Sequence, residues 1–213
     1  MSATASTRSS RRSQAERSEA TRNALLDATI ACLVEDGYAN TTTARVAERA
    51  GVSRGAHLHH FQTRAALVAA AVERLASRRR RELLAAAEEL PPGGRERIVR
   101  GLDLIWESYA SPLFQGALDL WTDARTDPEL RAHLVEVERA LDRHTLEFAT
   151  RLFPAAAASP DFDRLVELAV ATARGLSLLD TLHPGSDRNR QQWAFCRERL
   201  ADLFEQARAA AEG

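Results

Sequence analysis

The 213-residue chain contains no lysine, only two cysteines and no long uninterrupted apolar run. The cysteines, Cys32 and Cys196, lie far apart and form no Cys-x-x-Cys pair, so neither a zinc site nor a disulfide framework is expected. No stretch approaches the roughly 18 consecutive apolar residues of a membrane-spanning helix. The serine-, threonine- and arginine-rich start does not resemble a secretory signal peptide. We therefore expect a cytoplasmic protein with no membrane partner.

Signatures of catalytic sites are also missing. The sequence contains no Gly-x-Ser-x-Gly, P-loop, Gly-x-Gly-x-x-Gly or His-Glu-x-x-His motif. His57, His59 and His60 lie close together, but on a helix His57 and His60 share a face while His59 points elsewhere, and no zinc-ligand spacing surrounds them. We expect no enzyme activity, no metal site and no cofactor.

Valine and isoleucine are sparse, and no run alternates apolar and polar residues with the period of two that a half-buried strand shows. Alanine, leucine, glutamate and arginine dominate instead, and all four favour helix. Capping residues, prolines and glycines divide the apolar pattern into segments. The sequence therefore predicts an all-α fold of about nine helices and no sheet. The predicted helices begin near residues 16, 43, 54, 63, 95, 112, 128, 161 and 187, with the clearest ends near residues 36, 50, 60, 110, 183 and 210.

The charge is unevenly distributed along the chain. Residues 1–81 contain 14 arginines and 7 acidic residues, a net charge of +7, whereas residues 82–213 contain 15 arginines and 23 acidic residues, a net charge of −8. A basic N-terminal third joined to an acidic remainder indicates a polyanionic partner for the first part only. Charge alone leaves the alternative of unevenly solvated helix faces open.

The most informative segment is residues 41–64, TTTARVAERAGVSRGAHLHHFQTR. Its pattern predicts two short helices joined by Ala-Gly-Val-Ser, in which Gly51 permits the positive φ of a sharp reversal. This is the helix-turn-helix arrangement, whose second helix enters the major groove of DNA. Four apolar residues are expected to close the core of this domain: Val52 and Phe61, packed against Leu33 and Val34.

The second helix of this motif carries the residues expected to read DNA. Arg54 can form bidentate hydrogen bonds to guanine, worth about 1–3 kcal/mol of discrimination. Small residues beside it let the backbone approach the base edges, and hydroxyl groups and backbone N–H groups at helix starts can meet phosphates. The expected DNA-contacting residues are Thr42, Thr43, Arg45, Ser53, Arg54, Gly55, Ala56, Leu58, His59, His60 and Arg64.

Over about residues 20–75 the sequence resembles the TetR family of transcriptional regulators, including the Ala-Gly-Val-Ser turn and the His-His-Phe end of the second helix. One pair of residues departs from the family pattern, which commonly has leucine and then tyrosine where this chain has His57 and Leu58. We expect Leu58 to pack on a thymine methyl group in place of the tyrosine contact. We expect His57 to face solvent or DNA rather than the core.

The resemblance implies a ligand-responsive regulator, a repressor in the usual mode of the family, that binds palindromic operator DNA as a homodimer and is released by a small, apolar effector. Residues 1–15 are polar, small and basic and are expected to form a disordered arm. The resemblance implies a DNA-binding domain at 16–65 and a ligand-binding and dimerisation domain at 66–213. The last two helices, near residues 161–183 and 187–210, would form the dimer. The first of them is apolar on two sides, which independently indicates two packing partners.

The resemblance also implies a ligand pocket in the larger domain. The candidate pocket residues are Trp106, Tyr109, Phe114, Trp121, His144 and Phe148. Aromatic residues on an amphipathic stripe also fit plain core, so a structural role is the alternative for each. The alternative function is an all-helical, small-molecule-binding dimer without specific DNA binding.

Overall fold

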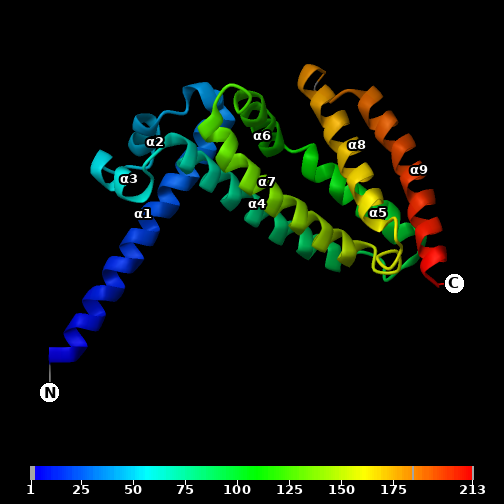
Figure 1. The fold of residues 1–213 in the computed structure, drawn as a ribbon, viewed down its shortest axis with the longest axis horizontal. Coiled ribbons are helices and arrows are strands. Elements are labelled where there is room, and N and C mark those ends of the chain that lie inside the picture. The colour runs from blue at the N-terminus through cyan, green and yellow to red at the C-terminus, as the bar shows by residue number, and fades with distance from the viewer. Residues whose placement is uncertain (1–2, 184, 213) are drawn as a thin grey trace. The chain divides into compact units, whose positions relative to one another are not determined.

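The computed structural model describes the backbone of residues 3–183 and 185–212, but not the side chains of residues 3–13, 112, 113, 115–117, 181 and 212. This part of the chain forms nine α-helices and no strand, as the sequence predicts (Figure 1). In chain order the helices are α1 (Ala3–Asn40), α2 (Thr43–Arg49), α3 (Arg54–His60), α4 (Arg64–Glu88), α5 (Gly94–Tyr109), α6 (Pro112–Asp123), α7 (Pro128–Leu152), α8 (Phe162–Leu182) and α9 (Asp187–Glu212).

Helix α1 starts earlier than the sequence predicts. A helix is expected from about residue 16, whereas the backbone is helical from Ala3, in a stretch whose alanines and arginines favour helix. The first two residues and every side chain before Gln14 lie outside the described residues, so the basic arm stays a prediction. At the other end, Gly37 interrupts the helix where predicted, since its φ of 70° and ψ of 173° suit glycine.

The chain divides into two compact units. Unit 1 comprises Met1–Leu75 and Asp119–Leu134, and unit 2 comprises Ala76–Leu118 and Val135–Gly213. Helices α4, α6 and α7 each contribute residues to both units. The functional boundary after residue 65 that the sequence suggests stays a prediction.

Unit 1 has two groups of buried apolar residues. The first contains Leu25, Leu26, Ala28, Cys32, Val46, Phe61, Leu67 and Ala71, with Val52 packed against it. The second contains Leu33, Tyr38, Ala65, Val68, Leu120, Ala124, Leu130 and Leu134.

The expected packing of Phe61 and Val52 against Leu33 and Val34 is therefore wrong. Leu33 belongs to the second group, and Val34 is 46% exposed. Leu25 and Cys32 are seven residues apart, so they share a face of α1, whereas Val34 is turned about 200° away from Cys32 at 100° per residue. The apolar pattern gives the position of helix α1 in the sequence. It does not show which side of α1 each neighbouring helix covers.

Unit 2 is built on α5, α8 and α9, which pack around Leu102, Ala169, Ala173 and Phe204. The predicted double face of α8 is present. One side of the helix is buried in this core, and the other leaves Leu168, Leu179 and Leu182 exposed.

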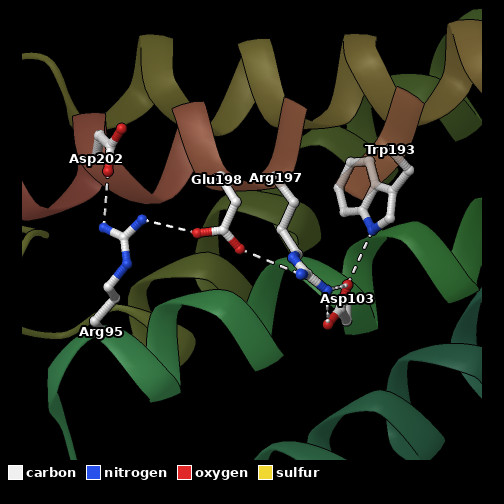
Figure 2. A network of polar contacts seen from close by, with 6 residues as sticks. All are labelled: Arg95, Asp103, Trp193, Arg197, Glu198 and Asp202. Atoms are coloured by element: carbon white, nitrogen blue, oxygen red, sulfur yellow. Dashed lines mark hydrogen bonds and ion pairs between the residues drawn. The ribbon is translucent and has the colours of Figure 1, made fainter. Parts of the chain in front are cut away.

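Polar groups connect α5 to α9 across the surface of this core (Figure 2). The buried Trp193 donates its indole N–H to Asp103, with an Nε1–Oδ1 distance of 2.9 Å, and Arg197 pairs with the same carboxylate at 3.0 Å. Arg197 also contacts Glu198, which pairs with Arg95 at 2.9 Å.

Among the described residues, no helix combines the length and the apolar character needed to cross a membrane.

Candidate nucleic-acid interface

Two capped helices and a glycine turn form the helix-turn-helix. The Thr42 side chain accepts a hydrogen bond from the Arg45 N–H at the start of α2, and the Ser53 hydroxyl accepts one from the Ala56 N–H at the start of α3, each at 3.2 Å. Between the helices Gly51 adopts a φ of 65°, as the reversal requires. The predicted starts of both helices and the predicted turn are confirmed.

Helix α3 has an exposed face and a buried face. Arg54, Gly55, Leu58 and His59 are all exposed, because residues at these spacings share one side of a helix. Leu58 is 52% exposed, so its apolar side chain is available for a contact outside the unit. We call these four residues the reading face. The remaining expected DNA contacts on α3, Ala56 and His60, are half-buried.

His57 corrects a prediction. It lies on the buried side with only 2% of its surface exposed, rather than facing solvent or DNA. In the family that the sequence resembles, the residue at this position is commonly leucine. The backbone of α3 directs the side chain at this position inward, whether it is leucine or histidine. Among the described residues its Nε2 atom has no hydrogen-bond partner, and burial, followed by the nearby His60, lowers the pKa of the ring.

The arginines around the motif differ in what they contact. Arg54 forms no ion pair or hydrogen bond with another described residue, so its guanidinium is available. Arg45 pairs with Asp36 at 2.9 Å while half of its side chain stays exposed. Arg49, which the sequence did not single out, pairs with Glu35 through both nitrogens at 2.5 Å and fastens α2 to α1.

Arg64 has partners inside unit 1. Its guanidinium lies 3.8 Å from the centre of the Tyr38 ring and donates a hydrogen bond to the Tyr38 carbonyl oxygen. The phosphate contact expected of Arg64 stays a prediction. Thr43 is half-buried at the start of α2.

The candidate effector-binding residues fall into two separate groups. Trp106, Tyr109 and Phe148 belong to the core of unit 2, and Phe114 packs edge-on against Tyr109 with ring centres 4.7 Å apart. Trp121 instead packs in unit 1, against the second apolar group. His144 is half-buried on α7.

Sequence reasoning missed two neighbours of this aromatic group. Trp193 stacks on Trp106 with ring centres 5.1 Å apart. The Arg174 guanidinium lies 5.3 Å from the Tyr109 ring centre and 3.9 Å from Glu138. The sequence signal that could have pointed to Arg174 is its position as a single arginine within the apolar stretch of α8. Burial raises the pKa of Tyr109.

No group of three or more histidine, cysteine, aspartate or glutamate residues able to hold a metal occurs among the described residues. His57, His59 and His60 therefore do not form such a site, and the inward orientation of His57 separates it from the exposed His59.

Comparison with known proteins decides the family. A sequence model described as bacterial regulatory proteins, tetR family, matches residues 25–71. The chain is 37% identical over 134 residues to the HTH-type transcriptional regulator CymR of Pseudomonas putida, covering 63% of this chain and 64% of CymR. It is 30% identical over 135 residues to the HTH-type transcriptional regulator BetI of Escherichia coli, covering 62% of this chain and 69% of BetI. The chain belongs to the TetR family.

Solved structures agree with a TetR-family fold along most of the chain. A TetR transcription regulator from Haloarcula marismortui superposes with a TM-score of 0.63 at 16% identity, covering 86% of this chain and 97% of that one. A transcriptional regulator from Saccharomonospora viridis, solved in complex with choline, superposes with a TM-score of 0.60 at 19% identity, covering 86% and 95%. The family model covers the helix-turn-helix, so this TetR-family chain is a DNA-binding transcriptional regulator and not an enzyme.

Proposed function

We propose that this TetR-family regulator is a cytoplasmic homodimeric repressor that binds a palindromic operator through α3 and is released by a small-molecule effector. The observation that carries the proposal is the reading face of α3, where an unpaired arginine, a glycine, an exposed leucine and an exposed histidine stand together. These groups supply hydrogen-bond donors, close backbone approach and an apolar contact for a thymine methyl group.

Specific and non-specific contacts come from different parts of the motif. Arg54 and Leu58 are proposed to read base edges, while Thr42, Thr43 and Ser53 at the helix starts are proposed to meet phosphates. Backbone N–H groups at helix starts favour anions, and phosphate contacts fix the register without reading sequence. The proposed order of events is that phosphates position α3 and the reading face then selects the operator.

The dimer is proposed to form through α8 and α9. Leu168, Leu179 and Leu182 lie within about 60° of one another around α8 at 100° per residue, and all three are exposed. Phe195 on α9 is also exposed. Water-exposed leucines at this density are typical of a protein interface. A two-fold dimer would read two half-sites about one helical turn apart, near 34–36 Å, which accounts for a palindromic operator.

The effector is proposed to bind among the aromatic residues of unit 2. Trp106, Tyr109 and Phe148 provide the apolar surface that small-molecule sites use. The S. viridis regulator was solved with choline, and a multidrug binding protein, EbrR, was solved with imidazole at a TM-score of 0.60 and 19% identity, covering 87% of this chain and 93% of that one. These relatives support a small-molecule ligand without naming the one used here.

Release then follows from a conformational equilibrium. The proposed effector residues belong to unit 2 and the reading face belongs to unit 1, so release is proposed to act through a change of conformation. An effector that binds one conformation of the dimer more tightly lowers operator affinity by that difference in affinity.

Selection of bound sequences from random duplexes by the full-length protein tests the proposal. We expect a palindromic sequence whose binding weakens steeply with salt, with a log–log slope of about −0.9 for each neutralised phosphate. Candidate apolar ligands are then titrated into the preformed complex. Failure to enrich any sequence would favour the alternative, an all-helical small-molecule-binding dimer, and equal ligand affinity of free and DNA-bound protein would remove the release mechanism.

A further inference from the structure

One tyrosine joins three helices of unit 1. Tyr38 is buried at the end of α1, and its hydroxyl donates a hydrogen bond to Asp127, with an Oη–Oδ2 distance of 3.1 Å. The other carboxylate oxygen of Asp127 accepts the backbone N–H of Leu130 at 2.9 Å and so caps α7. One aspartate therefore both starts α7 and holds it to the end of α1.

The same tyrosine holds the start of α4. Arg64, the first residue of α4, lies over the Tyr38 ring and donates to the Tyr38 carbonyl oxygen. Only three residues separate Arg64 from His60, the last residue of α3. The Tyr38 carbonyl oxygen also accepts the Thr41 N–H at 3.0 Å, directly before the cap of α2. The first residue of α4, which follows the motif, and the residue before the cap of α2 thus both bond to the Tyr38 carbonyl oxygen.

The positive charge of Arg64 also stabilises the ionised carboxylate of Asp127. The Leu130 N–H first, then the Tyr38 hydroxyl and the positive charge of Arg64 lower the pKa of Asp127, so its carboxylate is ionised at neutral pH. An ionised acceptor strengthens the hydrogen bond from the tyrosine. Helix α7 continues beyond Leu134, where unit 1 ends, into unit 2. The contact therefore lies on a helix that both units share.

We propose that Tyr38, Arg64 and Asp127 are positioning residues for operator binding, which lock the first turn of α7 to the helix-turn-helix in the conformation that binds DNA. The inference rests on the proposed function. It assigns α7 as the helix through which a change in unit 2 reaches α3, and it gives Arg64 a role that requires no contact with phosphate.

The test uses full-length variants and the duplex that the wild-type protein selects. Tyr38→Phe removes the hydroxyl and keeps the ring under Arg64. It should weaken operator binding about three- to tenfold, the net effect of one hydrogen bond, and leave binding to a random duplex unchanged. Asp127→Asn keeps both the cap and an acceptor and should stay within about twofold of the wild type. Asp127→Ser keeps the cap but is too short to reach the tyrosine, so it should match Tyr38→Phe.

Two further readouts separate positioning from simple stabilisation. The double variant Tyr38→Phe/Asp127→Ser should bind the operator no more weakly than either single variant, because one contact is lost only once. Hydrogen exchange of the amides of residues 130–134 should slow on operator addition in the wild type and not in Tyr38→Phe. The matched control, Thr126→Val, removes an exposed hydroxyl bonded only to its own turn and should behave as the wild type.

The outcomes distinguish the inference from the function on which it rests. Two results would overturn the positioning role and leave the proposed function in place. One is a Tyr38→Phe protein with wild-type operator affinity whose α7 amides slow their exchange on operator addition as the wild-type amides do. The other is additive losses in the double variant. A wild-type protein that selects no duplex would overturn the proposed function and this inference with it.

Discussion

At the scale of single residues, Arg54 is the side chain on which we expect operator choice to depend most. It is exposed at the start of α3 and has no partner among the described residues, so its loss leaves no broken contact inside the protein. We predict that Arg54→Ala weakens operator binding by about 1–3 kcal/mol, the range for a bidentate contact with guanine. Binding to a random duplex should fall only slightly.

Equilibrium titration against both duplexes at one salt concentration checks this prediction. Arg125→Ala is the matched control, because it removes the same charge from an exposed position of unit 1 outside the motif. Equal losses of specific and non-specific binding in Arg54→Ala would make Arg54 a phosphate contact only.

His57 makes a second residue-scale prediction, which concerns stability. A buried polar atom without a partner costs about 1–3 kcal/mol, so His57→Leu should raise the free energy of unfolding by about 1 kcal/mol at pH 7.5. The lowered pKa means that the unfolded chain binds a proton at His57 more readily than the folded chain. Wild-type stability should therefore fall as the pH drops below about 6.5, the ordinary pKa of histidine.

Urea unfolding of both proteins at pH 7.5 and pH 5.5 measures both effects. The variant should lose less stability than the wild type over this interval. Some loss should persist, because burial also lowers the pKa of His60, which therefore contributes in the same direction. Identical pH dependence in the two proteins would show that the buried ring is not the group that titrates.

At the scale of helices, α5 depends on a close approach at Gly101. A Cβ atom built there would lie 2.7 Å from Cε1 of Phe153, a buried ring that also packs on Phe204. Gly101→Ala should therefore lower the free energy of unfolding by about 1–3 kcal/mol, as overpacked cores do, despite a gain in helix propensity of up to about 1 kcal/mol. Thermal unfolding checks this.

Gly55→Ala on α3 is the contrasting substitution. Nothing lies within 4 Å of the Cβ position there, so the same change should preserve or raise stability. Gly55→Ala should instead weaken operator binding, because the glycine is proposed to let the backbone approach base edges.

A Gly101→Ala protein that is as stable as the wild type would mean that the Phe153 ring can move aside.

Helix positions could be predicted well because their signals are local. Ser53, Pro112 and Pro128 mark helix starts by chemistry that acts within one turn, and each starts a helix at or next to the predicted residue. The inward orientation of His57 could not be predicted from its chemical type, because histidine suits an exposed reading face as well as a buried position. The backbone position decided it.

Contacts between distant residues were outside the reach of sequence patterns. The bonds from Tyr38 to Asp127 and from Trp193 to Asp103 join residues 89 and 90 positions apart. Nothing in the local pattern of either partner names the other. For the same reason Trp121 was grouped with the unit 2 aromatics, although it packs in unit 1.

At the scale of the whole molecule, the exposed leucines of α8 carry the prediction of a dimer. Leu179 is among them, and burying a leucine on association contributes roughly 1.5–3 kcal/mol. A two-fold interface uses the same patch twice, so one substitution changes two contacts. We predict that Leu168→Glu/Leu179→Glu converts the dimer to a folded monomer, because an interface cannot bury four unpaired carboxylates.

Sedimentation and circular dichroism measure the oligomeric state and the fold of this variant. Operator affinity should fall by more than tenfold, since a monomer reads one half-site, while binding to an isolated half-site should match that of a wild-type protomer. Val135→Glu, which places a carboxylate at another exposed apolar position, on α7, is the control and should stay dimeric. A double variant that remains a dimer with full operator affinity would move the interface away from this face of α8, and the spacing of half-sites expected from it would no longer hold.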